Sequence, residues 1–433
     1  MNICVVGTGY VGLVAGTCMS DFGMNVICVD SDESKINMLN NGQIPIYEIG
    51  LSELVRRNVK QGRLKFSTDL KEAVTRSLVV FIGVGTPEND DGSSNLTQVR
   101  QVVAEIAGYI TDYKVIVIKS TVPVGTSREL RELVKQHNKA GVEFDIVSNP
   151  EFLREGAAVG DFLRPDRVII GADSERALSI IKEIYRPLYL LETPIVSTTN
   201  ETAEMIKYAS NTMLALKISF INEIANICDK VGADVYKVAT AVGMDKRIGP
   251  KFLHPGPGFG GSCFPKDIRA LVSTAESVGY DFQIGKALLS VNEHQKELVV
   301  KKSRDFLGGL DGKTICLLGL SFKPLTDDVR EAPAIHIARR LKDEGAVVQA
   351  YDPAALEQAR AQLPDINYHD DYLSAAKGAD LVIIATEWHE FRDLDFDQLK
   401  SLMNSPAIYD TRNIYDPAEV RKKGFKYICT GRH

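Results

Sequence analysis

The chain has 433 residues, of which 44% are hydrophobic and 25% are charged, and its formal net charge is −6. This composition is ordinary for a globular protein, and the length is sufficient for two or three domains. The acidic balance argues against a broad attraction to nucleic acid or to an anionic membrane. No apolar run reaches the ~18 residues of a membrane span, and the N-terminus shows no secretory signal. Seven scattered cysteines without a CxxC pair predict neither a metal site nor a disulfide framework, so we expect a cytoplasmic protein.

Short runs rich in Val and Ile alternate with amphipathic stretches in the first half of the chain. They are Asn2–Val6, Val26–Asp30, Leu78–Gly83, Val115–Ser120 and Glu143–Ser148. Such alternation is typical of βαβ units around a parallel sheet whose strands are buried on both faces. The pattern returns near the C-terminus at Thr314–Leu318, Val347–Tyr351, Asp380–Ala385 and Ala407–Asp410. We therefore predict an α/β protein with two Rossmann-like doubly wound domains.

The middle of the chain is predicted to be helical. Thr198 and Glu201 have the spacing of a capping box, and no Gly or Pro follows until Gly232. A helix of about 30 residues would span ~45 Å, so we interpret it as a connector and as a candidate oligomer interface. Gly249–Pro265 is rich in Gly and Pro and is expected to form a structured loop. The expected domains are 1–197, 198–308 and 309–433, with the long central helix and a helical middle domain joining the outer two.

A glycine motif follows the first predicted strand. In Gly7-Thr8-Gly9-Tyr10-Val11-Gly12, the first glycine permits a tight turn, the second lets the backbone approach a pyrophosphate, and the third allows close helix–strand packing. Asp30 ends the next strand at about the expected spacing of 20 residues. Its carboxylate would accept hydrogen bonds from ribose hydroxyls and would repel a 2′-phosphate. The motif therefore predicts NAD rather than NADP as the cofactor.

A cysteine stands in a second glycine-rich segment, Phe259-Gly260-Gly261-Ser262-Cys263-Phe264-Pro265-Lys266-Asp267. Most cysteines are small buried hydrophobic residues, and Cys4, Cys28 and Cys316 fit that description because they lie in predicted strands. Cys263 differs, because its small neighbours would let a substrate approach. Lys266 would favour a thiolate, and Asp267 is a candidate proton acceptor. Cys263 is therefore the candidate nucleophile.

Further motifs identify a family. They are Gly85-Thr86-Pro87, Ser120-Thr121-Val122-Pro123-Val124-Gly125-Thr126, Asn149-Pro150-Glu151-Phe152-Leu153-Arg154-Glu155-Gly156, Lys207 with Asn211, Phe322-Lys323-Pro324 and Thr326-Asp327-Asp328-Val329-Arg330. With the cysteine segment, they resemble the UDP-glucose dehydrogenase family in order and over essentially the whole chain. One departure is Leu325, where the family commonly has Asn.

The resemblance implies an oxidoreductase that converts UDP-glucose to UDP-glucuronate with two NAD and water. In that reaction Cys263 would form a thiohemiacetal and then a thioester, which retains the half-oxidised sugar while NAD is exchanged. Lys207 and Asn211 are four residues apart on one helix face and would stabilise an oxyanion. The implied catalytic residues are Cys263, Lys207, Asn211, Asp267, Glu151 and Thr121. The 1–197 domain would bind NAD, the 309–433 domain would bind the UDP-sugar, and the central helix would form a homodimer or a higher oligomer.

The resemblance also implies two sets of binding residues. Those for the cofactor are Gly7, Gly9, Tyr10, Val11, Gly12, Asp30, Lys35, Thr86, Thr121, Glu155, Lys266 and Arg330. Those for the nucleotide sugar are Glu151, Phe152, Leu153, Arg154, Glu155, Lys207, Asn211, Phe252, Leu253, His254, Pro255, Gly256, Gly260 and Lys323, with Arg247 reaching the site of the partner subunit.

Other interpretations stay open at this point. A sister enzyme acting on GDP-mannose or a UDP-N-acetylhexosamine would keep the same fold and cysteine, and a non-catalytic nucleotide-sugar sensor would keep the fold alone. Individual residues also have simpler interpretations. Lys207 could be a solvated helix lysine, Asp267 a helix cap, Glu151 and Glu155 surface charges, Phe322–Pro324 an ordinary turn, and Arg247 part of a surface ion pair.

Overall fold

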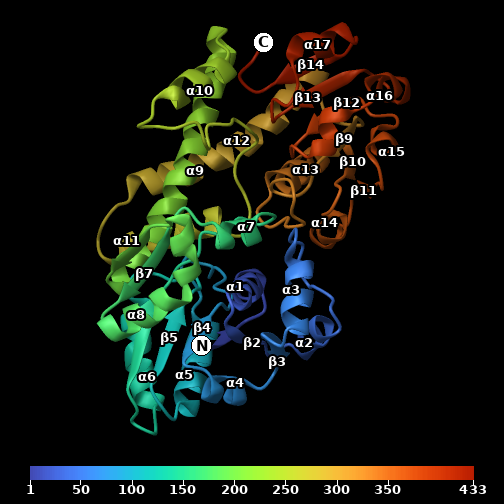
Figure 1. Cartoon of the computed structure of the whole chain (residues 1–433). Helices are drawn as coiled ribbons and strands as arrows, with labels where there is room; N and C mark the ends of the chain where they lie inside the picture. The colour runs from blue at the N-terminus through green and yellow to red at the C-terminus, as the bar shows by residue number, and fades with distance from the viewer. The chain divides into compact units, whose positions relative to one another are not determined.

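The computed structural model describes residues 1–433 and divides into two compact units (Figure 1). Unit 1 comprises Met1–Ser210 and Ser273–Gly279, and unit 2 comprises Asn211–Val272 and Tyr280–His433. Each unit is built around one sheet. None of the helices combines the length and apolar character needed to cross a membrane.

The sheet of unit 1 has eight strands in the order β3-β2-β1-β4-β5-β6-β7-β8. Neighbouring strands are parallel except β6 and β7, which are antiparallel. The strands are β1 (Asn2–Val6), β2 (Asn25–Val29), β3 (Leu64–Ser67), β4 (Val79–Ile82), β5 (Lys114–Ile118), β6 (Phe144–Ser148), β7 (Val168–Ala172) and β8 (Ile195–Thr198). The first six follow the order of a dinucleotide-binding fold, in which ligands bind beyond the carboxyl ends of the strands where the order reverses. Here that point lies between β1 and β4.

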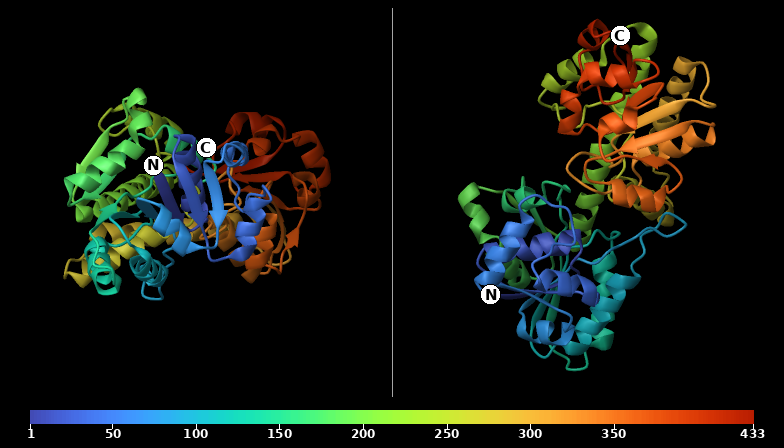
Figure 2. Two further views of the ribbon diagram at one scale, coloured as in Figure 1. Left: turned by 60° about the horizontal axis from the view of Figure 1, so that its bottom comes forward. Right: turned by 90° about the vertical axis from the view of Figure 1, so that its right-hand side faces the viewer.

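Helices cover both faces of this sheet (Figure 2). One face of the sheet packs against apolar residues of six helices. They are α1 (Tyr10–Asp21), α2 (Glu33–Asn40), α3 (Leu51–Lys60), α7 (Ala158–Leu163), α8 (Glu175–Ile184) and the short 3-10 helix η1 (Arg186–Leu191). The other face is covered by α4 (Leu70–Arg76), α5 (Thr97–Tyr109) and α6 (Thr126–His137). The central strands β1, β4 and β5 are apolar at almost every position because both faces are buried there.

Unit 2 repeats this arrangement with six parallel strands in the order β11-β10-β9-β12-β13-β14. They are β9 (Thr314–Leu318), β10 (Val347–Tyr351), β11 (Asn367–Tyr368), β12 (Leu381–Ile384), β13 (Ala407–Asp410) and β14 (Lys426–Cys429). One face packs on α12 (Gln283–Leu307), α13 (Pro333–Asp343) and α14 (Leu356–Gln362). The other packs on α15 (Tyr372–Ala376), η2 (His389–Asp393), α16 (Phe396–Leu402) and α17 (Pro417–Lys422). The two doubly wound sheets confirm the predicted fold class.

The long central helix is α9 (Asn200–Val231), with 32 residues. Its predicted start is wrong by one residue. Thr198 ends β8, and it is the hydroxyl of Thr199 that accepts a hydrogen bond from the backbone N–H of Thr202 at 3.3 Å. Thr198 therefore belongs to strand β8, and Thr199 caps the helix. The middle of the chain also contains α10 (Val235–Met244) and α11 (Phe264–Ser277), and the predicted Gly- and Pro-rich loop joins them.

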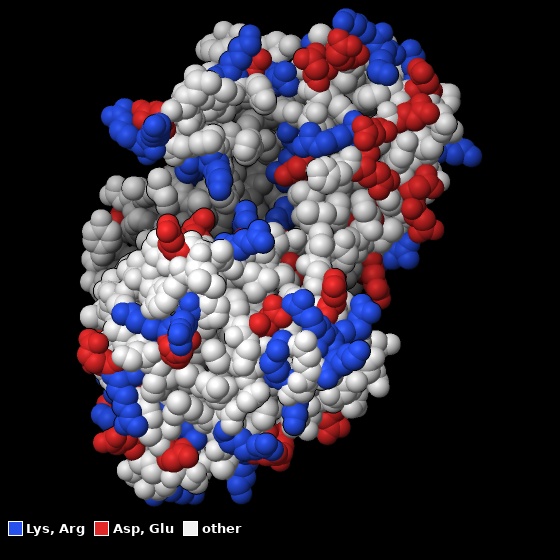
Figure 3. Space-filling model, viewed as in Figure 1, with Lys and Arg blue, Asp and Glu red and all other residues white.

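Charged side chains of both signs are interspersed over the face of the molecule in Figure 3. No large area of that face is covered by Lys and Arg alone. An anionic ligand must therefore be recognised there by individually placed groups rather than by a broad positive field.

Candidate active site

The glycine motif forms the turn between β1 and α1, at the carboxyl edge of the unit 1 sheet. Gly7 has a φ of +97°, which favours glycine. A Cβ on Gly12 would lie 1.9 Å from the carbonyl oxygen of Gly7, whereas a Cβ on Gly9 would meet no atom within 4 Å. The turn is thus tight, the helix lies close to the strand, and the backbone at Gly9, the N-cap of α1, borders open space. These are the features that admit a pyrophosphate to a helix N-terminus.

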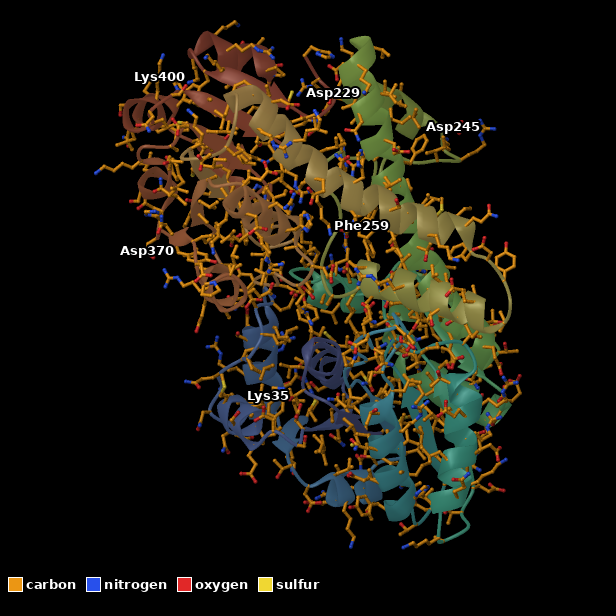
Figure 4. All side chains as sticks on the ribbon, turned by 180° about the vertical axis from the view of Figure 1, so that it is seen from behind. Lys35, Asp229, Asp245, Phe259, Asp370 and Lys400 are labelled. Carbon is orange, nitrogen blue, oxygen red and sulfur yellow. The ribbon has the colours of Figure 1, made fainter.

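Asp30 follows β2 and carries the expected carboxylate. Its Oδ2 accepts hydrogen bonds from the backbone N–H and the hydroxyl of Thr8, both at 2.7 Å, and its Oδ1 accepts one from the N–H of Asp32 at 3.0 Å. Burial alone would raise the pKa of Asp30, but these hydrogen bonds and nearby Lys35 lower it, so the carboxylate is ionised at neutral pH. Lys35, labelled in Figure 4, is half-exposed on α2. The residues present therefore fit NAD.

Tyr10 of the glycine motif reaches a partner that the sequence did not reveal. Its hydroxyl donates a hydrogen bond to the carboxylate of Glu48, a buried residue before α3. The backbone N–H of Gly156 donates to Glu48 Oε2 at 2.7 Å and lies 2.8 Å from the Tyr10 oxygen. Burial, together with Glu48, raises the pKa of Tyr10. The predicted cofactor turn is thus joined, within unit 1, to Gly156, which directly follows the predicted substrate residues 151–155.

The remaining cofactor candidates of unit 1 lie at the same sheet edge. The hydroxyl of Thr86, after β4, donates to the carbonyl of Thr121, after β5, at 2.9 Å. Val11 and Glu155 are half-buried. The loops after β1, β4 and β5 therefore meet beyond the carboxyl ends of the strands, which is where a dinucleotide binds in this type of fold.

Glu151 and Lys207 form a buried ion pair in unit 1. Lys207 Nζ on α9 lies 3.1 Å from Glu151 Oε1, and the two side chains are 4% and 6% exposed. The backbone N–H of Leu153 donates to Glu151 Oε2 at 2.5 Å, and Lys207 Nζ lies 5.3 Å from the centre of the Phe152 ring. The interpretations of a solvated lysine and of a surface glutamate are wrong for this pair. Buried, paired titratable groups at a sheet edge are typical of functional sites.

The neighbouring residues of this segment have other partners. Arg154 donates to Asp161 with Nη2 at 2.6 Å, and its side chain is 63% exposed. The guanidinium of Arg167 lies 3.8 Å from the centre of the Phe152 ring. A substrate contact by Arg154 would therefore require it to share or leave Asp161.

Glu204, one turn before Lys207, is a second residue that the sequence did not reveal. Its carboxylate accepts hydrogen bonds from the backbone N–H of Gly125 at 2.7 Å and from the N–H and hydroxyl of Ser127 at 2.9 and 2.6 Å. It is 3% exposed, and burial raises its pKa against the effect of these bonds. An anion at the N-terminus of α6 is favourable, so Glu204 fixes the segment after Thr121 against α9.

Cys263 directly precedes α11 in unit 2. It is half-buried, whereas the other six cysteines are buried. Burial raises the pKa of the thiols at Cys28 and Cys429 to about 12, which makes them inert at neutral pH. The carbonyl of Cys263 accepts the N–H of Asp267 at 2.9 Å, so Cys263 lies at the start of the helix, where a helix dipole in general provides stabilisation of negative charge. That stabilisation could not be recognised before the start of α11 was known.

Asp267 joins the cysteine segment to α9. Its Oδ2 accepts a hydrogen bond from Asn211 Nδ2 at 2.6 Å, and its Oδ1 lies 2.6 Å from Lys266 Nζ. Asp267 is 1% exposed and lies within the first turn of α11 rather than before it, so it is not the N-cap of this helix. Lys266, which the resemblance assigns to the cofactor, is paired with Asp267.

The backbone before Cys263 is held by buried amides. Asn222 Oδ1 accepts the N–H of Gly256 at 2.8 Å, and Gln295 Nε2 donates to the Gly256 carbonyl at 2.9 Å. Asn292 makes the same double contact with Phe259, which Figure 4 labels and which packs between α9 and α12. A Cβ on Gly260 would lie 2.2 Å from the Glu331 carbonyl oxygen, so only glycine fits there.

Residues 252–256, which are predicted to contact the nucleotide sugar and are called the predicted sugar loop, differ in exposure. Phe252 has a φ of +67° and is half-buried, as is Pro255. Leu253 is 2% exposed and belongs to a small core with Ile221, whereas His254 is exposed. Leu253 therefore supports the loop from inside, and its neighbours line the surface.

The second sheet does not repeat the cofactor site of the first. Asp352 follows β10 as Asp30 follows β2, but it is 1% exposed. Its Oδ2 accepts the N–H groups of Leu320 and Ser321 at 2.7 and 3.0 Å and the indole N–H of Trp388 at 3.1 Å. Asp30 also accepts hydrogen bonds from the protein but is half-buried, whereas the Asp352 carboxylate is shielded from any ribose. The resemblance between the halves extends to the fold but not to a second dinucleotide site.

The loop after β9 carries the remaining candidates. Lys323 is half-buried, with Nζ 5.5 Å from the Phe322 ring centre, and Arg330 donates to Asp328 with Nη2 at 2.8 Å. Leu325 has a φ of +62°, a left-handed conformation in which Asn is enriched, and its side chain packs on the core of unit 2. At this departure from the family pattern, the Leu side chain adds apolar packing, whereas Asn would adopt the left-handed conformation more readily.

Arg412 is a cation at this edge that the sequence analysis missed. It follows β13, and its Nε donates to the Ala385 carbonyl at 2.7 Å and lies 3.1 Å from Glu387. A Cβ on Gly256 would lie 2.9 Å from Arg412 Nη1. Arg412 therefore occupies the carboxyl edge beside the predicted sugar loop. The sequence signal was an Arg two residues after a buried strand.

Arg247 lies in the loop after α10 and is not brought to the other candidates. It pairs with Asp245, which Figure 4 labels, at 2.6 Å, and its side chain is 88% exposed. Within one chain this is the surface ion pair of the simpler interpretation. Lys217 of α9 donates to the carbonyls of Ile248 and Gly249 at 3.0 and 3.1 Å and so fixes the loop to the helix.

Comparison with known proteins is consistent across the chain. Residues 1–189, 201–294 and 316–417 match the NAD binding, central and UDP binding domains of one family, which confirms the prediction of NAD. A UDP-glucose 6-dehydrogenase of Rhizobium meliloti is 51% identical, with all of both chains covered. A UDP-glucose dehydrogenase structure from Pyrobaculum islandicum has a TM-score of 0.94 at 39% identity, covering 100% of this chain and 98% of that one. A UDP-D-ManNAc dehydrogenase structure from Pyrococcus horikoshii has a TM-score of 0.88 at 28% identity, covering 100% and 99%. The chain therefore belongs to the UDP-glucose/GDP-mannose dehydrogenase family.

Proposed function

We propose that this protein oxidises UDP-glucose to UDP-glucuronate with two NAD and one water. The observation that carries the proposal is Cys263, the one cysteine of seven that is not buried, placed at a helix N-terminus beside the Lys266–Asp267–Asn211 cluster. An oxidation that stops at an aldehyde needs no such thiol. An oxidation that continues to an acid gains from one, because the thiol retains the aldehyde between two cofactors.

NAD, when bound, accepts a hydride from the sugar carbon in each oxidation. The residues that would hold it are the Gly7–Gly12 turn, Asp30, Thr86 and Thr121, with Lys35, Glu155, Lys266 and Arg330 assigned by resemblance. Asp30 would orient the ribose, and the N-terminus of α1 would receive the pyrophosphate. The occupied Asp352 supports a single NAD site, so both oxidations would use the same pocket in turn.

The protein's residues would divide the proton and charge chemistry. Asp267, acting with a water, would take the proton of the sugar hydroxyl in the first oxidation. The Cys263 thiolate would then add to the aldehyde carbon, and the oxygen that becomes an alkoxide would be stabilised by Lys207 and Asn211. The second oxidation leaves a thioester. Glu151 would remove a proton from water as it attacks the thioester carbon and releases the thiolate, with Thr121 positioning water or cofactor.

The nucleotide part of the substrate is assigned to unit 2. Most of its sheet, from Cys316 in β9 to the end of β13, lies within residues 316–417, which match the UDP binding domain of the family, and this supports recognition of a UDP-sugar. We propose that Lys323 and Arg412 contact the diphosphate, because both are cations at the carboxyl edge of that sheet. The segments 252–256 and 152–155, with Gly260, would contact the nucleoside and the sugar.

Two rivals are less well supported. A sister enzyme for another nucleotide sugar fits the fold, but the UDP-D-ManNAc dehydrogenase structure is 28% identical, against 51% for the UDP-glucose 6-dehydrogenase of Rhizobium meliloti. A sensor would have no need of the buried Glu151–Lys207 pair or of a half-exposed thiol at a helix start. The buried ion pair costs the free energy of desolvating both charges, which a sensor would have no chemical reason to retain.

We also propose a homodimer or higher oligomer formed through α9. Met213, Phe220 and Ile227 follow one another at intervals of seven residues, and their side chains are 56%, 50% and 54% exposed. That spacing forms an apolar stripe that suits a second copy of the same helix. Arg247, held to α9 by way of Lys217, would then reach the substrate of the partner subunit.

The absence of any disulfide among the seven cysteines supports the predicted cytoplasmic location.

The test is the yield of NADH per sugar. The protein is mixed with a limiting amount of UDP-glucose and excess NAD, and the NADH absorbance is followed to its end. Two NADH per UDP-glucose, with UDP-glucuronate as the product, supports the proposal. The same assay with GDP-mannose and UDP-N-acetylhexosamines identifies a sister enzyme, and no NADH from any of these sugars would support the sensor.

A further inference from the structure

The strand β5 has a buried lysine at each end. Lys114 begins the strand, is 2% exposed, and pairs with Asp112. Lys119 follows the last residue of the strand, is 4% exposed, and forms no ion pair. Buried lysines normally have a carboxylate partner, because removing an ammonium from water is costly. Lys119 is the exception, and it lies at the carboxyl edge where the candidate site is.

Lys119 forms hydrogen bonds to one residue, and its Nζ also lies 5.8 Å from the centre of the Phe162 ring. Its Nζ donates to the backbone carbonyl oxygen of Asn149 at 3.3 Å and to Asn149 Oδ1 at 3.2 Å. Asn149 is itself fixed, since Tyr185 donates to its Oδ1 at 2.6 Å and its Nδ2 donates to the Ile169 carbonyl at 2.7 Å. Lys119, Asn149 and Tyr185 therefore form a buried hydrogen-bond network at the start of the segment that begins with Asn149.

This segment leads directly to the Glu151–Lys207 pair. Asn149 precedes Pro150, whose ring restricts the backbone, and Glu151 follows with its carboxylate 3.1 Å from Lys207 Nζ. A shift of the Asn149 carbonyl would therefore move Glu151. The charges also interact. Burial lowers the pKa of Lys119 to about 8, Glu151 acts to raise it, and Lys207 acts to lower it.

We propose that Lys119 is a positioning residue for the Glu151–Lys207 pair, holding the Asn149–Glu151 turn through the Asn149 carbonyl and supplying a fixed positive charge behind the pair. The inference rests on the proposed function, because it gives Lys119 a purpose in the chemistry of those two groups. Lys119 itself contacts neither of them by a hydrogen bond. It acts through Asn149 and through its charge.

The test compares three variants with the wild type. Lys119→Met removes the donor and the charge at similar volume, Lys119→Gln keeps a donor without the charge, and Lys114→Met is the matched control at the other end of the strand. Wild-type NADH yield is measured first with the nucleotide-sugar panel. If the wild type oxidises a sugar other than UDP-glucose, the proposed substrate is wrong, and the variants are then compared with the sugar that it does oxidise.

We expect Lys119→Met to lower kcat by about 100-fold, because displacement of a catalytic group by about 1 Å has an effect of that size. NAD affinity, measured by titration, should match that of Lys114→Met. Lys119→Gln should recover part of kcat, and in both Lys119 variants kcat should lose the dependence on pH near 8 that titration of the ammonium imposes on the wild type.

Two results would overturn the proposal. In one, kcat of Lys119→Met and its pH profile are the same as those of Lys114→Met. In the other, both Lys119 variants fail to fold while Lys114→Met folds, as shown by thermal unfolding, which would make Lys119 a structural residue only. A wild type that oxidises no sugar of the panel would remove the proposed function and this inference together.

Discussion

Asn211 on α9 donates a 2.6 Å hydrogen bond to the carboxylate of Asp267, which lies one helical turn after Cys263. The bond fixes the first turn of α11 independently of the thiol. The cysteine can therefore be changed without releasing the segment that holds it, which makes its role open to a clean test.

Cys263→Ser should abolish steady production of UDP-glucuronate, with kcat falling by about 1,000-fold or more, because serine is a far weaker nucleophile at neutral pH. NAD affinity and thermal stability should change little. The measurement is NADH formation with UDP-glucose, combined with calorimetric titration of NAD. Cys228→Ser, at a buried position in α9, should keep its activity. An undiminished rate of glucuronate formation by Cys263→Ser would refute the thioester route.

Asp30→Asn should weaken NAD binding by about 10- to 100-fold, the effect of losing hydrogen bonds to a charged group. UDP binding should be unaffected, since the UDP binding match lies in unit 2. The control is Asp352→Asn at the corresponding position of the second sheet. It should lower the melting temperature, because its carboxylate accepts buried N–H groups, and leave NAD affinity unchanged. Equal NAD affinities of the Asp30 variant and the wild type would contradict the cofactor assignment.

Most interior strands could be predicted closely from the sequence, whereas the buried interior strand β7 and the edge strands were not predicted. The strands β1, β9, β10 and β13 begin and end at the predicted residues, because a strand buried on both faces must be apolar at almost every position. The edge strand β8 and the two-residue β11 are largely exposed and have no such run, so they were not predicted.

The site shows the same division. The glycine motif and the cysteine segment are local in sequence, and their residues meet in the structure because they are neighbours in the chain. Glu48 and Glu204 meet partners that are at least 38 and 56 residues away, respectively, and only the packing of the helices on the sheet brings those groups together. Residue types alone could not reveal either carboxylate.

Gly260→Ala should impair catalysis by displacing the cysteine segment. The new Cβ would lie 2.2 Å from a backbone oxygen of Glu331, and a backbone cannot rotate away as a side chain can. We expect a loss of about 1–3 kcal/mol in the free energy of unfolding and a fall in kcat. Gly108→Ala in α5 is the control, since its Cβ meets no atom within 4 Å, and it should be neutral or stabilising. Denaturant unfolding measures the free energy of unfolding, and NADH formation measures kcat. Equal values of both quantities for the two variants would contradict the prediction.

The stability of the protein should rise with pH where Lys119 titrates. Its pKa is lowered by burial from 10.5 to about 8. Between these values the unfolded chain binds a proton that the folded chain does not, so the free energy of unfolding increases with pH there, by up to about 3 kcal/mol. Below the window both states are protonated, and above it neither is. Denaturant unfolding at several pH values should show this rise in the wild type and in Lys114→Met but not in Lys119→Met. Parallel curves for all three would show that the ammonium is not perturbed.

Phe220→Asp should separate the subunits. It places a charge in the middle of the apolar stripe of α9, where a second copy would bury it without a partner. Light scattering should report a mass near 47.6 kDa for the variant and at least twice that for the wild type. Val59→Asp, at a 44% exposed position of α3, should leave the wild-type mass unchanged. A wild type of 47.6 kDa under assay conditions would exclude both the oligomer and the role proposed for Arg247.

Cys263 is the one cysteine whose side chain is not buried, so the folded chain can be labelled selectively at this position. A small alkylating reagent applied at neutral pH should label one position in seven, because the other six thiols are shielded from solvent. Mass spectrometry of the intact chain would then count competent sites directly, and a preparation in which several positions react would contain misfolded molecules.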